Sequence, residues 1–230
     1  MKRVFVPTQD GSDWQRLLAK PDLHWKVGKS AMTLAASWEA SHPLLPPEVA
    51  AACAALGVDA GYVAAFPEWQ VALPGGATAS QTDLLVLGRS TRGMVVLAIE
   101  GKVDEPLGPT LGEKRAGASA GVTERLAFLH EILGLSTPAP DMLRYQLFHR
   151  TASAILAARE FGAAHAVMVV HSFSPSGQWY DDFAAFTQHL GVDAPKGSIT
   201  TVPRHHAPTL SVGWIPGDLR HLETQLPRAR

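Results

Sequence analysis

The chain contains a single cysteine, Cys53, among its 230 residues. One thiol cannot form an internal disulfide framework or supply a Cys-rich zinc site. Cys53 stands within the run Ala-Ala-Cys-Ala-Ala-Leu, which is typical of a small, buried helical residue. The sequence therefore excludes disulfide-stapled and zinc-ribbon proteins.

An excess of charge of either sign is also missing. Lys and Arg number 20 and Asp and Glu number 21, which gives a formal net charge of −1. The chain as a whole makes no electrostatic case for nucleic-acid binding, and any such partner would have to meet a local basic surface.

Long hydrophobic runs are absent too. No segment of the sequence approaches the ~20 apolar residues of a membrane span. Residues 1–7 lack a sustained apolar stretch with a cleavage site. We therefore expect a cytoplasmic protein with no membrane partner.

What the chain does contain is typical of a globular protein, with 46% hydrophobic and 18% charged residues. Its length suits one well-filled domain spanning 1–230. The patterns predict helices at 30–42, 49–56, 123–134, 141–161 and 180–190, and strands at 69–73, 82–88, 94–103, 166–173 and 210–215. This order of elements predicts an α/β fold, with α+β as the neighbouring class.

Charged residues stand at the ends of two of these apolar strands. Asp83 lies at the start of 82–88, whereas Glu100 and Lys102 end 94–103. A short polar loop between the strands predicts an antiparallel hairpin. Because side chains alternate along a strand, Glu100 and Lys102 project to one face, and Gly101 leaves the backbone between them open to close approach. Two carboxylates and an ammonium group at one place suit a hard cation and an activated water.

With these residues in place, the chain resembles the PD-(D/E)XK nuclease superfamily. The core of that superfamily is a helix, three antiparallel strands, a helix and a further strand, with an aspartate on the second strand and (D/E)-x-K on the third. Asp83 and Glu100-Gly101-Lys102 match these positions, although Thr82 stands where the motif has proline. The resemblance covers about residues 30–173. It implies a restriction-endonuclease-like core with a mixed central β-sheet flanked by helices, and 174–230 would be a C-terminal elaboration.

The resemblance also implies metal-dependent hydrolysis of a phosphodiester bond. Asp83, Glu100 and the carbonyl of Gly101 would bind Mg²⁺ or Mn²⁺. Lys102 would position or activate the attacking water, or stabilise charge on the phosphate. Glu39, on the expected first helix, would add a ligand or orient a water.

The helix after the third strand matches the superfamily as well. Gln146, His149 and Arg150 are spaced three and four residues apart and so share a face. Gln146 or Arg150 would contact the phosphate or support the metal ligands, with His149 a further candidate. The implied substrate is nucleic acid, DNA ahead of RNA, or a smaller phosphodiester. The oligomeric state stays open, and a homodimer is compatible with it.

Purely structural explanations compete with these roles. Glu100 and Lys102 would then form only a cross-strand ion pair, Glu39 would face solvent, and the polar stripe of helix 141–161 would be solvated. The protein would be a non-catalytic binding or scaffold protein on the same fold. Gly117-Ala118-Ser119-Ala120-Gly121 spells the serine-hydrolase G-x-S-x-G, but no strongly apolar strand precedes it, as a nucleophile elbow requires.

Overall fold

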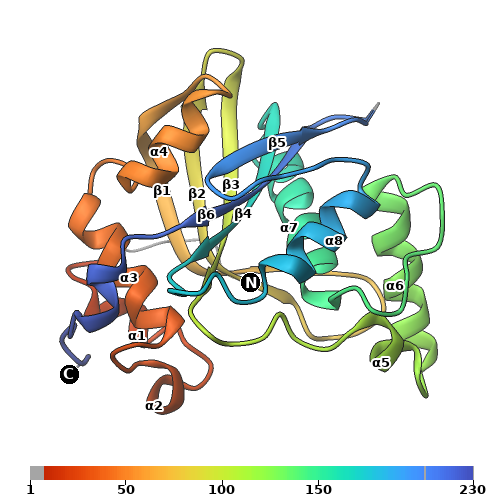
Figure 1. Cartoon of the computed structure of the whole chain (residues 1–230), viewed down its shortest axis with the longest axis horizontal. Helices are drawn as coiled ribbons and strands as arrows, with labels where there is room; N and C mark the ends of the chain where they lie inside the picture. Colours follow the sequence, from red (N-terminus) through yellow and green to blue (C-terminus); the bar gives the residue numbers. More distant parts are fainter. Residues whose placement is uncertain (1–7, 205, 230) are drawn as a thin grey trace.

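A six-stranded sheet runs through the molecule in the order β1-β2-β3-β4-β6-β5 (Figure 1). The structure is a computed structural model that describes residues 8–204 and 206–229. Residues 1–7, which bear on the expected absence of a leader peptide, lie outside the described part. The strands are β1 (Val58–Val71), β2 (Ser80–Ser90), β3 (Gly93–Lys102), β4 (His165–Ser172), β5 (Ser198–Val202) and β6 (Thr209–Pro216).

The sheet is mixed because two kinds of connection build it. β1, β2 and β3 form an antiparallel meander, in which the tight turn Thr91-Arg92 joins β2 to β3. β4 pairs with β3 in parallel after the chain 103–164 has crossed over, and β6 pairs with β4 in parallel and with β5 antiparallel. Parallel neighbours need such long crossovers because a short turn cannot return the chain to the same end of the sheet.

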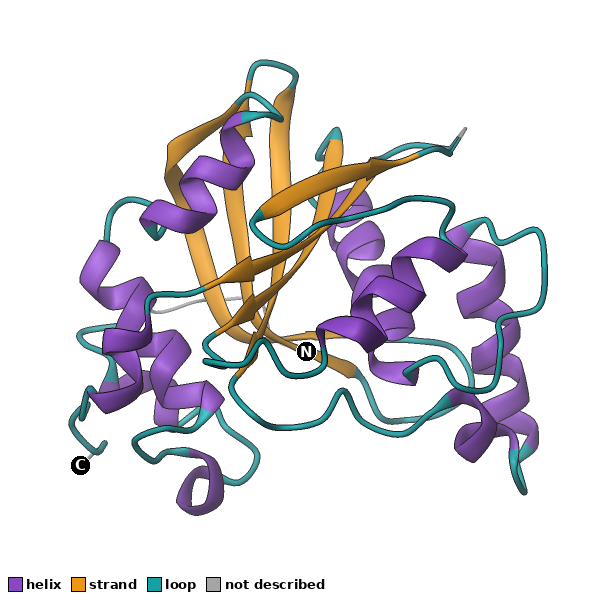
Figure 2. Cartoon of the chain, in the orientation of Figure 1, coloured by secondary structure: helices purple, strands orange, loops and turns teal. Residues whose placement is uncertain are grey.

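Helices cover both faces of the sheet (Figure 2). α3 (Ser30–Ser41) and α4 (Pro47–Ala54) pack with Leu84 and Val86 on one face, whereas α7 (Tyr145–Glu160) packs with Leu85 and Leu87 on the other. Alternate residues of β2 thus supply two separate cores, as the pleat of a strand dictates. The other helices are α1 (Ser12–Gln15), α2 (Pro21–His24), α5 (Leu111–Arg115), α6 (Ala120–Leu133), α8 (Tyr180–His189) and the 3₁₀ helix η1 (Leu219–Glu223).

This architecture confirms the prediction of an α/β protein with a mixed central sheet flanked by helices. In the segment 174–230, which was expected to be a C-terminal elaboration, β6 extends the central sheet by pairing with β4. Within the described ranges, no helix has the length and apolar character needed to cross a membrane.

Several elements differ from the predicted ones, among them the short helices α1, α2, α5 and η1, which were not predicted. β1 begins at Val58 rather than at residue 69. Its first half was not predicted because it is mostly half-exposed and rich in Ala, Gly and Asp, which are weak strand formers. β5 was not predicted at all; it is a short edge strand held by β6. The helix expected from 141 begins at Tyr145, since Arg144 forms a β-bridge with Thr110.

Candidate active site

The charged residues singled out at the strand ends meet at the open end of the β2–β3 hairpin. On β3, Glu100 and Lys102 follow Val96 and Ala98 on the face that α7 covers. Asp83 precedes Leu85 on the same face of β2. The structure therefore brings together the three residues that the sequence placed on one hairpin.

The two strands part at this end, and the Asp83 side chain fills the gap. The ladder ends at the pair Leu84 and Ile99, and the backbone N–H of Gly101 donates to Oδ2 of Asp83 at 2.9 Å instead of to a strand carbonyl. The carbonyl of Gly101 points the same way as its N–H, as in any strand. Gly101 packs closely against α3, and a Cβ at this position would lie 3.2 Å from Cδ2 of Leu34.

Glu100 is the hub of the site. Its carboxylate is 3% exposed, and its Oε1 accepts hydrogen bonds from Nζ of Lys102 and Nε2 of Gln146, both at 2.7 Å. Oε2 accepts from Nε of Arg150 at 2.5 Å. Burial alone would raise the pKa of Glu100, but the two cations outweigh burial and lower it to about 2. Glu100 is therefore ionised at neutral pH.

Arg150 links both sides of the hairpin end. Besides Glu100, its guanidinium reaches Oγ of Ser80 at 3.2 Å, and its Nη2 lies 4.0 Å from Oδ1 of Asp83. Burial favours the neutral forms of Arg150 and Lys102, yet Glu100 raises the pKa of both. Both cations stay charged under the helix.

Asp83 has a different environment from Glu100, although the two are neighbours. Its side chain is 25% exposed. Burial, together with the negative charge of Glu100, raises the pKa of Asp83 to about 7. Asp83 is thus the carboxyl of the hairpin end whose charge is incompletely balanced.

A third carboxyl, Glu68, joins the site and was not predicted. On β1 it falls between the ladder pairs Pro67–Leu84 and Trp69–Thr82, which puts it across from Asp83. Its φ of 55° is rare for a residue other than glycine. Burial, followed by the charge of Asp83, raises the pKa of Glu68 to about 8. Glu68 directly precedes the predicted strand 69–73, so the signal that marked Asp83, a charge at the start of an apolar strand, was also present here.

His149 and Ser80 form a neutral pair at the edge of this cluster. Nδ1 of His149 lies 2.8 Å from Oγ of Ser80, which also accepts a hydrogen bond from Arg150. Burial, then the charge of Arg150, lowers the pKa of His149 to about 3. His149 therefore stays uncharged at neutral pH and contacts Ser80 rather than a carboxylate.

Glu39 is not brought to the cluster, which corrects its predicted role. It lies on α3, and α3 packs on the opposite face of the sheet from α7. Its Oε1 accepts a hydrogen bond of 2.7 Å from Nε1 of Trp14. Ser119 of the G-x-S-x-G run is the N-cap of α6, where its Oγ accepts from the N–H of Val122.

The oxygen donors of the site suit a hard cation, although they are not gathered around one point. Within 8–204 and 206–229, no group of three or more His, Cys, Asp or Glu side chains is arranged to hold a metal ion, and Lys102 and Arg150 occupy Glu100. Oδ2 of Asp83 accepts from Gly101 and Oε2 of Glu68 accepts from Gln81, whereas Oδ1 of Asp83 faces Nη2 of Arg150 at 4.0 Å. Three carboxyls face two cations, so an added cation would relieve the repulsion that raises two of their pKa values.

The other basic residues near α7 do not form an open basic surface. Arg115 pairs with Asp141, and Arg144 pairs with Asp182 and donates to the carbonyl of Gly108. Lys114 lies over the ring of Tyr145, 4.9 Å from its centroid. Each of these cations is engaged by a neighbour.

Fold and site together define an α/β protein with a buried carboxylate–cation network at the open end of its central hairpin. The chain belongs to a family described as a domain of unknown function, DUF6946, whose model matches residues 7–219. No curated protein and no solved structure matches the chain.

Proposed function

We propose that the chain is a metal-dependent phosphodiester hydrolase, a nuclease-like enzyme of the PD-(D/E)XK type. The observation that carries the proposal is the convergence of Asp83, Glu100 and Lys102 at the parted end of the β2–β3 hairpin. Gln146 and Arg150 join them from α7, the helix on which the resemblance placed supporting residues. Strongly perturbed pKa values cluster at functional sites, and this network at the strand ends contains such values.

In this proposal Mg²⁺ or Mn²⁺ would be held by Asp83 and the carbonyl of Gly101, with Glu68 as a further carboxylate. The ion, when bound, would polarise a phosphate oxygen and lower the pKa of an attacking water. Glu100 would hold Lys102 and Arg150 in place rather than act mainly as a ligand, since both of its oxygens are occupied.

Lys102 would supply the positive charge of the reaction. Only one of its three N–H donors is used by Glu100, so the others could meet a water or a phosphate oxygen. Because Glu100 raises the pKa of Lys102, the ammonium would stabilise developing negative charge rather than accept a proton.

The test is incubation of the protein with mixed single- and double-stranded DNA and RNA in the presence of Mg²⁺ or Mn²⁺. We expect cleavage by the wild type and a loss of at least about a hundredfold in Asp83→Asn and Lys102→Met, since each removes a charge acting on the transition state. Asp59→Asn, on an exposed position of β1, is the matched control. Absence of cleavage by the wild type, or unchanged cleavage in both site variants, would overturn the proposal.

A non-catalytic binding or scaffold protein on the same fold is the second candidate. The full engagement of Glu100 by three side chains favours it, because such a network also serves to fix α7 on the sheet. This candidate predicts nucleic-acid or protein binding without turnover. Fluorescence anisotropy with labelled DNA and RNA, run beside the cleavage assay, distinguishes the two candidates.

The proposal extends to DNA ahead of RNA as substrate and to a cytoplasmic location. The free, buried thiol of Cys53 agrees with a reducing compartment. A homodimer is compatible with the proposal, and sedimentation velocity would measure the oligomeric state.

A further inference from the structure

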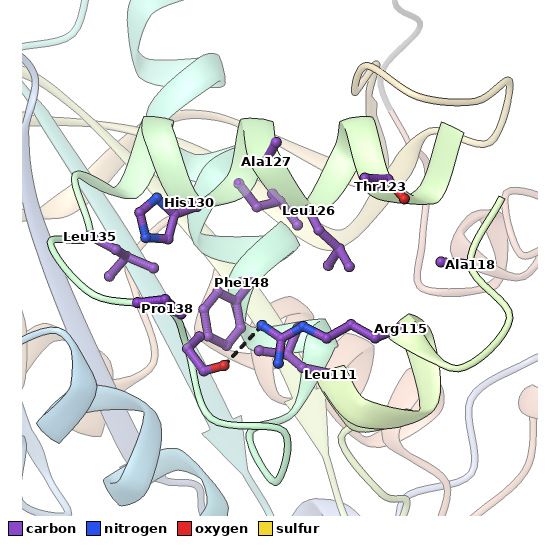
Figure 3. Close-up of a pocket in the computed structure, with 12 residues that line it drawn as sticks. Leu111, Arg115, Ala118, Thr123, Leu126, Ala127, His130, Leu135, Pro138 and Phe148 are labelled. Atoms are coloured by element: carbon purple, nitrogen blue, oxygen red, sulfur yellow. Dashed lines mark hydrogen bonds between the residues drawn. The ribbon is translucent and has the colours of Figure 1, made fainter. Parts of the chain in front are cut away.

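An apolar cavity lies between α5, α6, the segment after α6 and the first turns of α7. Its volume is about 480 Å³, within the range of pockets that hold small molecules. Leu126 and His130 of α6 face Leu111, Arg115 and Phe148 across it (Figure 3). None of the residues that line it belongs to the carboxylate–cation network, so the cavity is separate from the candidate active site.

The polar side chains that line this cavity are few, namely Arg115, Thr123 and His130. Arg115 is the one lining residue that carries a fixed charge, and neither Asp nor Glu is among the lining residues, all of which are described. Nη2 of Arg115 donates to the carbonyl of Ala139 at 2.9 Å, and Nη1 pairs with Asp141. A guanidinium has five N–H donors, so these two contacts leave others for a ligand.

The ion pair of Arg115 does not block this use. The side chains of Arg115 and Asp141 are 40% and 73% exposed, and exposed ion pairs contribute little free energy. An incoming carboxylate can therefore share the guanidinium, whose planar fork matches a carboxylate. His130 lines the same cavity, and its Nε2 donates to the carbonyl of Thr137 at 3.1 Å.

We propose that this cavity binds a small amphipathic acid, an apolar chain or ring that carries one carboxylate. The apolar body would lie against Leu126, Leu129 and Phe148, which are joined by Leu135 and Pro138 on the wall. The carboxylate would meet Arg115 at the rim. The concave apolar wall and the single cation select this class of ligand over a neutral or cationic one.

Isothermal titration calorimetry with decanoate, 1-decanol and decyltrimethylammonium tests the proposal. We expect decanoate to bind, decanol to bind about tenfold more weakly, since it lacks the charge that Arg115 recognises, and the cation not to bind. Leu126→Trp, which fills the cavity, should abolish binding. Glu124→Trp, on an exposed position of α6 that does not line the cavity, should leave binding unchanged.

Arg115→Gln separates charge recognition from the shape of the cavity. We expect decanoate to bind this variant about tenfold more weakly and decanol to bind it as before, whereas Lys114→Gln should change neither. Equal binding of the cationic ligand, undiminished binding in Leu126→Trp, or equal loss of both ligands in Arg115→Gln would overturn the proposal.

Two further measurements define other occupants and separate this inference from the proposed function. A wild-type dimer that Leu126→Trp converts to a monomer in sedimentation velocity would identify a second copy of the chain as the occupant and overturn the small-molecule proposal. Asp83→Asn should bind decanoate like the wild type, because Asp83 does not line the cavity. Failure of nucleic-acid cleavage would leave these results unaffected.

Discussion

Asp83 and Glu100 lie side by side at the hairpin end, yet their surroundings give the two carboxyls opposite properties. Three donors hold Glu100 ionised, whereas burial and a like charge raise the pKa of Asp83. Removing one partner of a buried charge network leaves the others uncompensated. Removing a carboxylate that is itself poorly compensated relieves repulsion. The two residues should therefore respond in opposite ways to neutral substitution.

We predict that Glu100→Gln lowers the free energy of unfolding by about 3 kcal/mol, because Lys102 and Arg150 would stay buried without their counter-charge. Asp83→Asn should change it by less than about 1 kcal/mol, or raise it, at pH 8 without divalent cations. Urea unfolding of the three proteins measures both values. Equal destabilisation by the two substitutions would mean that Asp83 is held as tightly as Glu100.

His149 predicts a pH dependence of stability. Its pKa is about 3 in the folded protein and near 6.5 in the unfolded chain. Between these values the unfolded chain binds a proton that the folded protein does not, so stability falls as the pH falls from about 6.5 toward 3.

We expect His149→Asn to remove part of this loss, on the order of 2 kcal/mol over that window. The amide of the introduced asparagine can still form a hydrogen bond with Ser80, which replaces the 2.8 Å contact of His149 with Ser80. Urea midpoints at pH 7 and pH 4 for wild type and variant measure the difference. Parallel pH profiles of the two proteins would contradict the assignment.

The sequence located the trio Asp83, Glu100 and Lys102 because a charge in an apolar strand is costly unless it has a partner. No comparable signal exists for Glu39, because a glutamate in a helical sequence does not show which face of the sheet its helix will cover. Glu68 carried the same signal as Asp83 but was missed, because the strand that holds it was expected to begin at Trp69, the residue after Glu68. Unusual charged residues can thus be identified from the local sequence, whereas their partners on neighbouring strands depend on the register in which the strands pair.

Among the elements, the β1–β2 connection is fixed by α6. Nε of Arg125 donates to the carbonyl of Pro74, and its Nη2 donates to those of Leu73 and Gly76. Gly75 and Gly121 let the two backbones meet: a Cβ on Gly121 would lie 2.6 Å from the carbonyl oxygen of Gly75. These contacts hold the β1–β2 connection, which leads into β2 at Ser80, against α6.

We predict that Gly121→Ala lowers the free energy of unfolding by about 1–3 kcal/mol, because backbone atoms cannot yield as a flexible side chain can. Gly61→Ala is the control, since the nearest atom to its added Cβ would be 3.9 Å away. Thermal unfolding compares the two variants. A stable Gly121→Ala protein would show that the connection can move away from α6.

Elements with strong local patterns were predicted well, and those specified by pairing were not. The β2–β3 hairpin and α6 have apolar patterns bounded by glycine, and they occur where expected. The first half of β1 and all of β5 depend on neighbouring strands for their extended form. Such edge segments have no inward-facing apolar series long enough to be recognised in the sequence.

At the scale of the whole molecule, the last described residues close over the first helices. Nε1 of Trp25 donates to the carbonyl of Pro227 at 3.1 Å, and the N–H of Ala229 donates to Oε1 of Gln15 at 2.9 Å. Leu226 lies against Gly11. The region 11–25 is therefore held partly by the chain after η1.

We predict that truncation after Thr224 exposes this region without unfolding the sheet. Trp25 is 2% exposed, so loss of its cover should shift tryptophan fluorescence to longer wavelength and speed amide exchange in 11–25. Exchange in β3 and β4 should be unchanged. Hydrogen exchange read by mass spectrometry checks both, and equal exchange in full and shortened chains would show that the helices hold themselves.

The parallel pairing of β3 with β4 also bears on how the chain is made. During synthesis the β1–β3 meander emerges first, and its β3 edge has no neighbour until residues 103–172 have followed. At roughly 5–20 residues per second, this exposure lasts for seconds. Because β3 is apolar on both faces, the nascent chain exposes throughout that time an edge strand whose unpaired backbone groups can pair with another chain. Slow translation within 103–164 should therefore favour aggregation on the ribosome, and a chaperone that covers β3 should prevent it.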